Sequence, residues 1–363
     1  MQVSLIDLKA QYLSIKSEID KAIENVLRNG NFILGVEVKK FEEEVARYTG
    51  VKYAIGVNSG TDALFLALKS LNIGSGDEVI IPSFSFFATA GVISLTGAKP
   101  VFVDIRPDTY NIDTTQIKDK ITKNTKAIIP VHLYGQPVDL DEILSIAKEY
   151  NLKIIEDSAQ AIGAEYKGRK VCSFGDIGAL SFYPTKNLGA CGDAGMILTN
   201  SEELAKKLKS LRTHGESKKY IHSHIGINSR LDELQAVILH TKFKYLEVWN
   251  EKRRRNAKIY NNLLKNVVIP YELDFVKHVY HQYTVRVKER EKLQKYLQEK
   301  GISTAIHYPC PIHLQEAYQK LGYNVNLPES EKAAKEVLSL PNYPEISEEA
   351  ITYVACNINN FNG

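Results

Sequence analysis

Cysteine is scarce in this sequence, and the few cysteines lie far apart. The 363 residues contain four of them, and none forms a C-x-x-C pair. That spacing marks many zinc and redox sites, so its absence argues against such a centre. We therefore expect no bound metal and reduced, mostly structural thiols, as in a cytoplasmic protein. The four are Cys172, Cys191, Cys310 and Cys356.

Long apolar runs and a strong charge imbalance are missing as well. No stretch approaches the ~20 apolar residues that cross a bilayer. Residues 1–9 lack the basic start and apolar run of a secretory leader. The net charge is only +3, which does not indicate a nucleic-acid-binding surface. We expect a globular, cytoplasmic protein that binds neither a membrane nor nucleic acid.

What the sequence does contain is an alternation of strand and helix patterns. Apolar residues at helical spacing fill residues 8–50, with a break at Gly30 and Asn31. Strand-like runs alternate with helices from Val51 onward, which predicts an α/β domain with a mainly parallel sheet. The expected strands are 53–57, 78–82, 100–103, 125–131, 153–156, 179–182 and 195–199, and the expected helices are 62–71 and 140–150.

The last third of the chain has a different character. One long helix is expected at 230–265, a half-buried strand at 282–287, and a helix at 291–300 that ends at Gly301. A chain of this length suits a large domain and a smaller one. We expect a large α/β domain at residues 1–245 and a small α+β domain at residues 246–363.

A polar segment, 59–64, separates the first strand of the alternation from its helix. Gly60 lets the backbone approach an anion closely, and Ser59 and Thr61 add hydroxyl groups. The start of the helix adds free N–H groups and a positive dipole end. Because Ser and Thr also begin many helices as simple caps, this segment alone indicates either an anion site or a cap.

Acidic residues end the strand at 153–156. The carboxyl ends of strands in open α/β sheets carry ligand-binding groups, and Asp157 stands at such an end. Its carboxylate either caps a helix or faces a pyridine nitrogen, which it would keep protonated. A protonated pyridine ring is the electron sink on which pyridoxal phosphate (PLP) chemistry depends.

A lysine, Lys186, follows the strand at 179–182 in a stretch with few acids. Gly189, Gly192 and Gly195 come directly after it and allow close backbone packing. Burial would lower the pKa of the amine and make it a nucleophile for carbonyl carbons. A Ser/Thr turn, a strand-end Asp about 100 residues later and then this lysine form a combination that chance seldom assembles.

In these segments the chain resembles the fold type I, PLP-dependent nucleotide-sugar aminotransferases of the DegT/DnrJ/StrS family. The resemblance covers nearly the whole chain, from 5–8 to 339–341. It implies a PLP cofactor and transfer of an amino group from L-glutamate to a keto sugar nucleotide. The motifs that carry it are 59–64, 156–160, 181–189, 192–195, 226–230 and 307–315.

The resemblance also implies roles for single residues. Lys186 holds the cofactor covalently and moves a proton between two carbon centres. Asp157 pairs with the ring nitrogen, and Gln160 bonds the phenolic oxygen of the ring. Phe86 stacks on the ring face, whereas Phe87 is expected in the core because neighbours on a strand face opposite ways. The phosphate is bound by Ser59, Gly60, Thr61 and Ser181, and by Asn228 from the other subunit of a homodimer with shared sites.

The substrate contacts implied by the resemblance lie near both ends of the motif set. Tyr183 stands where many family members carry His, and His307, Tyr308 and His313 lie in one later motif. Segments 181–190 and 306–315 resemble the sugar 3-aminotransferase branch. They favour amination at C-3 of a dTDP-linked 3-keto-6-deoxyhexose.

Several alternatives stay open at this point. A UDP-linked 3-keto N-acetylamino uronate is one rival substrate, and Arg230 would bind its carboxylate. A 4-keto sugar nucleotide is the next, followed by a small amino acid or amine. A non-catalytic regulator on the same fold is a different class of function, because fold alone does not fix activity. His132 and His240 belong to no ligand cluster and are expected to be structural.

Overall fold

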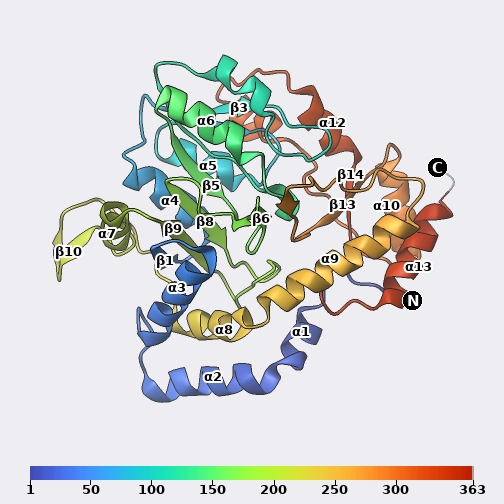
Figure 1. Ribbon diagram of the computed structural model, residues 1–363, viewed down its shortest axis with the longest axis horizontal. Helices are drawn as coiled ribbons and strands as arrows, with labels where there is room; N and C mark the ends of the chain where they lie inside the picture. The colour runs from blue at the N-terminus through green and yellow to red at the C-terminus, as the bar shows by residue number, and fades with distance from the viewer. Residues whose placement is uncertain (362–363) are drawn as a thin grey trace.

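A computed structural model describes residues 1–361 and shows a large sheet wrapped by helices (Figure 1). Within these residues seven strands form that sheet, in the order β1-β9-β8-β5-β4-β2-β3. Pairing is parallel from β8 across to β3, whereas β9 runs antiparallel to both of its neighbours. The predicted mainly parallel sheet is confirmed. The strands are β1 (Tyr53–Val57), β2 (Glu78–Pro82), β3 (Lys99–Val103), β4 (Thr125–Ile128), β5 (Lys153–Asp157), β8 (Ile177–Ser181) and β9 (Gly195–Thr199).

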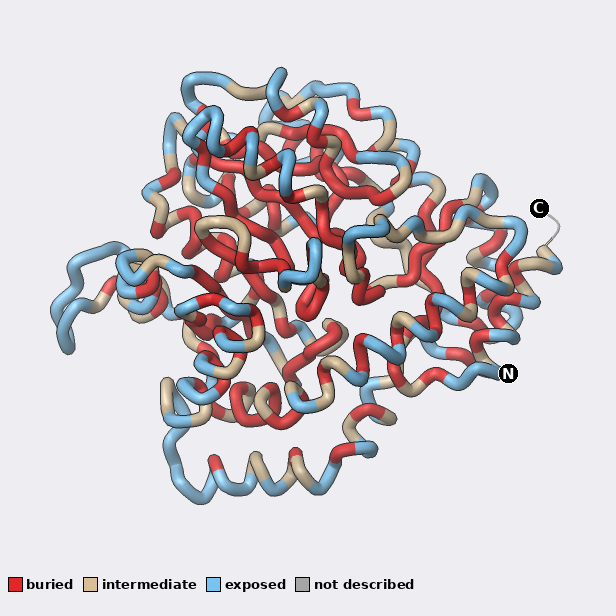
Figure 2. The backbone as a smooth tube through the Cα atoms, in the orientation of Figure 1, coloured by how far each residue is buried: buried red, intermediate tan, exposed pale blue. Residues whose placement is uncertain are grey.

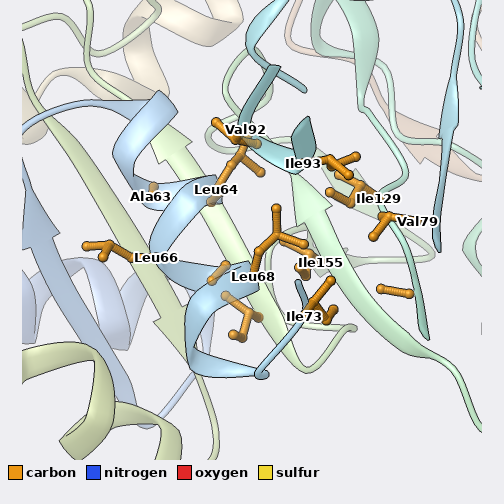
Figure 3. Close-up of a cluster of buried hydrophobic side chains, with 14 of the residues drawn as sticks. Ala63, Leu64, Leu66, Leu68, Ile73, Val79, Val92, Ile93, Ile129 and Ile155 are labelled. Carbon is orange, nitrogen blue, oxygen red and sulfur yellow. The ribbon is translucent and has the colours of Figure 1, made fainter. Parts of the chain in front are cut away.

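Helices cover both faces of the sheet. Successive residues of a strand point to opposite faces, so each strand contributes apolar side chains to both helical layers. Ile155 and Ile197 join a cluster with the helices of one face, while Ile154 and Met196 join clusters on the other. Figure 3 shows the first cluster, in which leucines of one helix pack against valine and isoleucine side chains. The covering helices are α3 (Val36–Thr49), α4 (Gly60–Ser70), α5 (Ala88–Leu95), α6 (Leu140–Tyr150), α7 (Glu202–Leu211) and α8 (Glu233–Phe243).

The N-terminal helices follow the predicted pattern. Helices α1 (Leu8–Ser14) and α2 (Lys16–Asn29) precede α3, and α2 ends at Gly30 with φ of 66°. That left-handed conformation suits glycine, which explains the break. Helix α2 lies along one edge of the molecule (Figure 1) and packs its apolar side against α8.

The single helix predicted at 230–265 is wrong, because the chain bends at Lys244 and Tyr245. It forms α8 and then α9 (Leu246–Leu263). The Tyr245 hydroxyl donates to Glu18 on α2, and its ring stacks on Trp249 at 5.8 Å between centroids. These contacts fix the bend, which turns α9 toward the C-terminal elements (Figure 1).

The C-terminal region forms a second apolar cluster around a short antiparallel sheet. Strands β13 (Tyr283–Arg286) and β14 (Val337–Leu340) pair there, and Gly301, at φ of 74°, follows the helix α10 as predicted. The division into two domains between residues 245 and 246 stays a prediction. The last two residues of the predicted small domain, 362 and 363, lie outside the described residues. Helices α9, α10 (Arg290–Glu299) and α13 (Glu348–Asn359) supply side chains to this cluster. Helix α11 (Glu316–Gln319) packs through Tyr318 into the cluster of Figure 3, and α12 (Pro328–Glu336) packs into a further cluster.

Two small sheets lie outside these clusters. Strand β6 (Glu165–Tyr166) pairs with β7 (Arg169–Lys170) and β12 (Val276–Lys277). Strands β10 (Glu216–Lys218) and β11 (Ile221–His222) form a hairpin that projects from the body and is exposed along its length (Figure 2). No helix between residues 1 and 361 has the length and apolar character to cross a bilayer.

Candidate active site

A cavity of about 520 Å³ opens at the carboxyl ends of β5 and β8. Parallel strands bring their carboxyl ends to one edge of a sheet, so residues far apart in the sequence meet there. The volume lies in the range of small-molecule sites. Eleven of the predicted site residues line it, namely Ser59, Gly60, Thr61, Phe86, Asp157, Gln160, Ser181, Tyr183, Lys186, His307 and Tyr308.

The N-terminus of α4 forms one end of the cavity. The Ser59 side chain accepts a hydrogen bond from the N–H of Asp62 at 3.1 Å, and the first intrahelical bond runs from Ala63 to Ser59 at 3.0 Å. The N–H groups of Gly60 and Thr61 precede these bonds and remain available to an anion. The cap is confirmed, because Ser59 accepts from the N–H of Asp62, and an anion site stays a prediction, which the helix start beside the cavity allows.

Two glycines make this end of the cavity possible. A Cβ on Gly60 would lie 2.7 Å from the Cβ of Ser181, and one on Gly195 would lie 2.3 Å from the carbonyl carbon of Ser59. Such approaches are sterically forbidden, so only glycine lets β8, β9 and the turn pack this closely. The packing brings the Ser181 hydroxyl beside the helix start.

Asp157 is a buried carboxylate on the cavity wall. It is 5% exposed, and its two oxygens accept hydrogen bonds from Thr89 at 2.9 Å and from the N–H of Ala159 at 3.2 Å. Burial raises the pKa of this carboxyl, while the two hydrogen bonds and the charge of Lys186 act in the opposite direction. Among the described residues no cation lies within ion-pair distance of it. A cation bound in the cavity would hold it ionised.

Gln160 presents its amide nitrogen to the same space. Its oxygen accepts from the N–H of Tyr134 at 2.7 Å, which fixes the orientation of the amide. The nitrogen then donates to the Tyr308 hydroxyl at 3.0 Å. An oxygen acceptor on a bound ring would therefore meet a donor here.

Lys186 enters the cavity from the loop after β8. Its surroundings lower the pKa of the amine to about 8, chiefly through burial, while the charge of Asp157 opposes the shift. At pH 7 the neutral, nucleophilic amine is then present in roughly one molecule in ten, against about one in 2,500 for an ordinary lysine.

Aromatic side chains close the cavity. Phe86 lines it and is 57% exposed, with its ring 6.1 Å from that of Tyr308. The expectation that Phe87 lies in the core is wrong, since Phe87 is 42% exposed and packs on Tyr318 at 5.7 Å. The alternation of a strand does not apply, because β2 ends at Pro82 and Phe87 precedes α5.

His307 and Tyr308 bring the C-terminal region to the cavity. The Nδ1 atom of His307 and the Ser339 hydroxyl share a hydrogen bond of 2.9 Å. Burial and the charge of Lys186 lower the pKa of His307 to about 4, so its ring is neutral near pH 7. Tyr183 also lines the cavity and is 53% exposed.

Three predicted site residues do not line the cavity. Asn228 and Arg230 flank Ser229, whose hydroxyl donates to Asp62 on α4 at 2.7 Å. Asn228 and Arg230 therefore lie near the end of the cavity that the start of α4 forms, which is called the phosphate end below. His313 is buried, with its ring nitrogens next to Ser83 and Glu331. The structure thus gives His313 a packing position and leaves it away from a ligand in this cavity.

The expected structural histidines are confirmed. His132 is fully buried between Glu156 at 3.2 Å and the N–H of Val138 at 3.1 Å. His240 lies between Glu37 and Glu44 on α3. Neither ring borders the cavity.

The sequence missed several cavity residues. Thr89, which holds Asp157, lies within a stretch that was singled out only for Phe86. His281 and Gln282 line the wall beside Lys186, yet no motif or spacing marks them. Their proximity arises from the turn that leads into β13, which is a tertiary feature.

The residues present fit PLP on structural grounds. A helix start with free N–H groups suits the phosphate, and a buried carboxylate without a bound cation suits a pyridinium nitrogen. Between these two, an oriented amide donor suits a ring oxygen, and an amine of lowered pKa suits an aldehyde.

Comparison with known proteins identifies the family of this chain. The model of the DegT/DnrJ/EryC1/StrS aminotransferase family matches residues 13–359. The chain belongs to this family. Members of the DegT/DnrJ/EryC1/StrS family are PLP-dependent, and solved neighbours hold PLP or its amino form, PMP. The protein is therefore a PLP-dependent sugar aminotransferase.

Relatives in the family match almost end to end. A Geobacillus stearothermophilus protein named pleiotropic regulatory protein is 51% identical over 99% of each chain. The dTDP-3-amino-3,6-dideoxy-alpha-D-galactopyranose transaminase of Aneurinibacillus thermoaerophilus is 48% identical, again over 99% of each chain. The crystal structure of S. venezuelae DesV superposes with a TM-score of 0.96 at 42% identity, covering 98% of this chain and 97% of that one. Further relatives are named as aminotransferases of UDP-linked sugars.

Proposed function

We propose that this enzyme transfers the amino group of L-glutamate to C-3 of a dTDP-linked 3-keto-6-deoxyhexose, with PLP bound to Lys186. The observation that carries the proposal is the pairing of Lys186 and Asp157 in one cavity. An amine of lowered pKa and a buried carboxylate there supply a nucleophile and an anionic partner. When bound, PLP provides the electron sink that stabilises negative charge on a neighbouring carbon.

The side chains of this protein supply the rest of the chemistry. Asp157, held by Thr89, would keep a ring nitrogen protonated, and Gln160, oriented by the N–H of Tyr134, would donate to a ring oxygen. With PLP bound, the free Lys186 amine would be the group that moves a proton between two carbons, because burial lowers its pKa to about 8 and the neutral base is then accessible. Phe86, which lines the cavity, would stack on the ring face.

Names of relatives support amination at the third carbon. Those at 43% to 48% identity include two dTDP-3-amino sugar transaminases and two UDP-linked 3-oxo or 3-dehydro sugar aminotransferases. All four names specify position 3. The nucleotide is less well supported, so a UDP-linked 3-keto N-acetylamino uronate stays the main rival and a 4-keto sugar the next. For the uronate, Arg230 would bind the substrate carboxylate, although it does not line the cavity of its own chain.

A substrate panel tests this choice. We expect kcat/KM for a dTDP-3-keto-6-deoxyhexose to exceed that for the 4-keto isomer by about 100-fold, because a misplaced carbonyl loses near-attack geometry. The measurement compares both compounds and the UDP uronate side by side, with product identification by NMR. Preference for the 4-keto sugar overturns the C-3 assignment, and preference for the uronate overturns the nucleotide assignment.

We further propose a homodimer in which each active site takes Asn228 from the partner. Asn228 is exposed and lies beside the phosphate end of its own cavity without lining it. The projecting β10–β11 hairpin nearby carries Tyr220 and Ile221, which are 82% and 58% exposed. Large apolar side chains of this exposure fit a surface that a second copy covers.

Hybrid dimers test the shared site. Lys186→Ala and Asn228→Ala chains are each expected to be inactive. Mixed and allowed to exchange at equal amounts, they should regain about a quarter of wild-type activity, because half of the dimers are hybrids with one intact site. Hybrids that form, by mass spectrometry of tagged chains, but stay inactive would contradict the proposal.

A regulatory protein without catalysis is the alternative from another class, and two relatives carry names of that kind. Membership of the aminotransferase family argues against it. A regulator has no physical need for a lysine of lowered pKa beside a buried carboxylate. Turnover of glutamate by the purified protein separates the two functions.

A further inference from the structure

His281 lies in the cavity wall next to Lys186, and nothing above gives it a role. It is 6% exposed, and both it and Gln282 line the cavity. Its Nδ1 atom lies 3.1 Å from the Oδ1 atom of Asn187, the residue that follows Lys186 in the chain. The orientation of the Asn187 amide therefore decides which nitrogen of the ring carries the proton.

Two backbone carbonyls fix that orientation. The Asn250 amide nitrogen donates to the carbonyl of Ile162 at 3.1 Å, so the Asn250 oxygen faces Asn187 and accepts from it at 2.7 Å. The Asn187 nitrogen also donates to the carbonyl of Val279 at 3.1 Å. A carbonyl can only accept, so neither amide can be reversed without placing two acceptors together. Both amides are buried, which makes an unpaired group there costly.

The tautomer of His281 follows from this relay. Asn187 presents its oxygen, so the Nδ1 atom of His281 must carry the hydrogen. Burial, and next the positive charges of Lys186 and Arg253, hold the pKa of His281 well below its usual range, so the ring is neutral. Its Nε2 atom then has a free lone pair, met only by the Gln282 amide nitrogen at a long 3.5 Å within residues 1–361.

Lys186 is the donor that this lone pair suits. The free amine carries up to three N–H donors, and the structure gives it no side-chain hydrogen bond among the described residues. Asp157 attracts it, but both Asp157 oxygens already accept from Thr89 and Ala159. The ionisable groups around this wall are Asp157, Tyr183, Asp193, Arg253, His307 and Tyr308.

We propose that, when the cofactor is in its amino form, the free Lys186 amine turns within the cavity to donate a hydrogen bond to the Nε2 atom of His281, a contact that residues 1–361 do not form in this structure. His281 is then a positioning residue, which holds Lys186 in the cavity during the half-reactions. The inference rests on the proposed role of Lys186 as the reacting amine. This role gives a reason for two buried asparagines, from distant segments of the chain, to fix the orientation of one histidine ring.

Two substitutions separate the acceptor from the fold. His281→Asn keeps an amide near Asn187 but removes the atom at the Nε2 position. His281→Gln places an amide oxygen near that position. In full-length protein loaded with pyridoxamine 5′-phosphate, which leaves Lys186 free, the pH dependence of acylation at Lys186 is followed by peptide mass spectrometry.

We expect the pKa of Lys186 to fall by about one unit in His281→Asn, because a neutral acceptor favours the charged amine, and to recover in His281→Gln. A pKa that is the same in all three proteins overturns the proposal. Matching thermal unfolding of the variants excludes a purely structural effect.

Nitrogen NMR of protein labelled in its histidine rings tests the tautomer directly. His281 should show a protonated Nδ1 and an unprotonated Nε2, and either variant assigns the signal, so one unstable variant does not prevent the test. The opposite tautomer overturns the proposal. If borohydride instead fixes the cofactor to a lysine other than Lys186, the proposed function fails, while the tautomer reading stands by itself.

Discussion

Replacing Lys186 with alanine is expected to lower turnover by on the order of 10⁴-fold, because one amine both anchors the cofactor and moves the proton. Purified wild-type protein should be yellow, and borohydride should fix the cofactor to the peptide that contains Lys186. The variant should lose the borohydride-fixed label but still bind the cofactor weakly, since the start of α4 and Asp157 remain.

The pH dependence of covalent capture supplies a second signature of Lys186. Only the neutral amine attacks an aldehyde, and burial lowers its pKa to about 8. The rate at which cofactor-free protein captures added PLP should therefore rise with pH, reach half of its maximum near pH 8 and level off above about pH 9. An ordinary lysine would keep gaining rate toward about pH 10.4.

Lys242 is the matched control. It is also buried, and burial also lowers the pKa of its amine, but it donates to the carbonyl of Gly189 at 2.7 Å and does not line the cavity. Lys242→Met should keep the colour and the label. A label on Lys242, or on any lysine other than Lys186, would falsify the assignment.

Asp157→Asn is expected to slow amino transfer from glutamate by about 100-fold or more while the protein stays folded. The charge that keeps the ring nitrogen protonated is lost, and each unit of pKa shift is worth about 1.4 kcal/mol, or tenfold in rate. The amide can retain both local contacts if the Thr89 hydroxyl rotates to accept from it. The measurement is single-turnover formation of the amino form of the cofactor.

Glu156, the neighbour on β5, provides the control for Asp157. It points to the opposite face, where its oxygens accept from the N–H groups of Cys172, Phe174 and Gly175 at 2.6 to 2.8 Å. Glu156→Gln should reduce the free energy of unfolding by about 1–3 kcal/mol and leave the rate near wild type. Similar slowing in both variants, or normal rates in Asp157→Asn, argues against the proposed role.

Local signals in the sequence explain which parts of the fold were predicted. The strands read correctly because alternating runs and glycine turns are local, although β4 ends at Ile128, before Pro130, and not at Val131. The bend at Tyr245 was missed because its cause, contact with Glu18 on α2, is more than 200 residues away in the chain.

The same distinction holds for the site. Lys186, Asp157 and the turn at Ser59 stand at strand ends, where the sequence places ligand-binding groups. Thr89 and His281 were missed because only the packed structure brings them to the cavity. His313 shares a motif with His307, yet the chain turns it toward Ser83 and away from the cavity.

The order of strands in the large sheet also decides when this protein can fold during synthesis. Strand β1 at one edge pairs with β9, from Tyr53 against Thr199 to Val57 against Gly195. About 140 residues must therefore leave the ribosome before β1 meets its partner, which takes roughly 7 to 28 s at 5–20 residues per second. Until then β1 exposes an unpaired edge, and non-local pairing of this kind is slow. Fragments that end before Gly195 lack β9, so β1 keeps an unpaired edge and the fragments should aggregate. The same late strand also completes the active site, because Gly195 packs against Ser59.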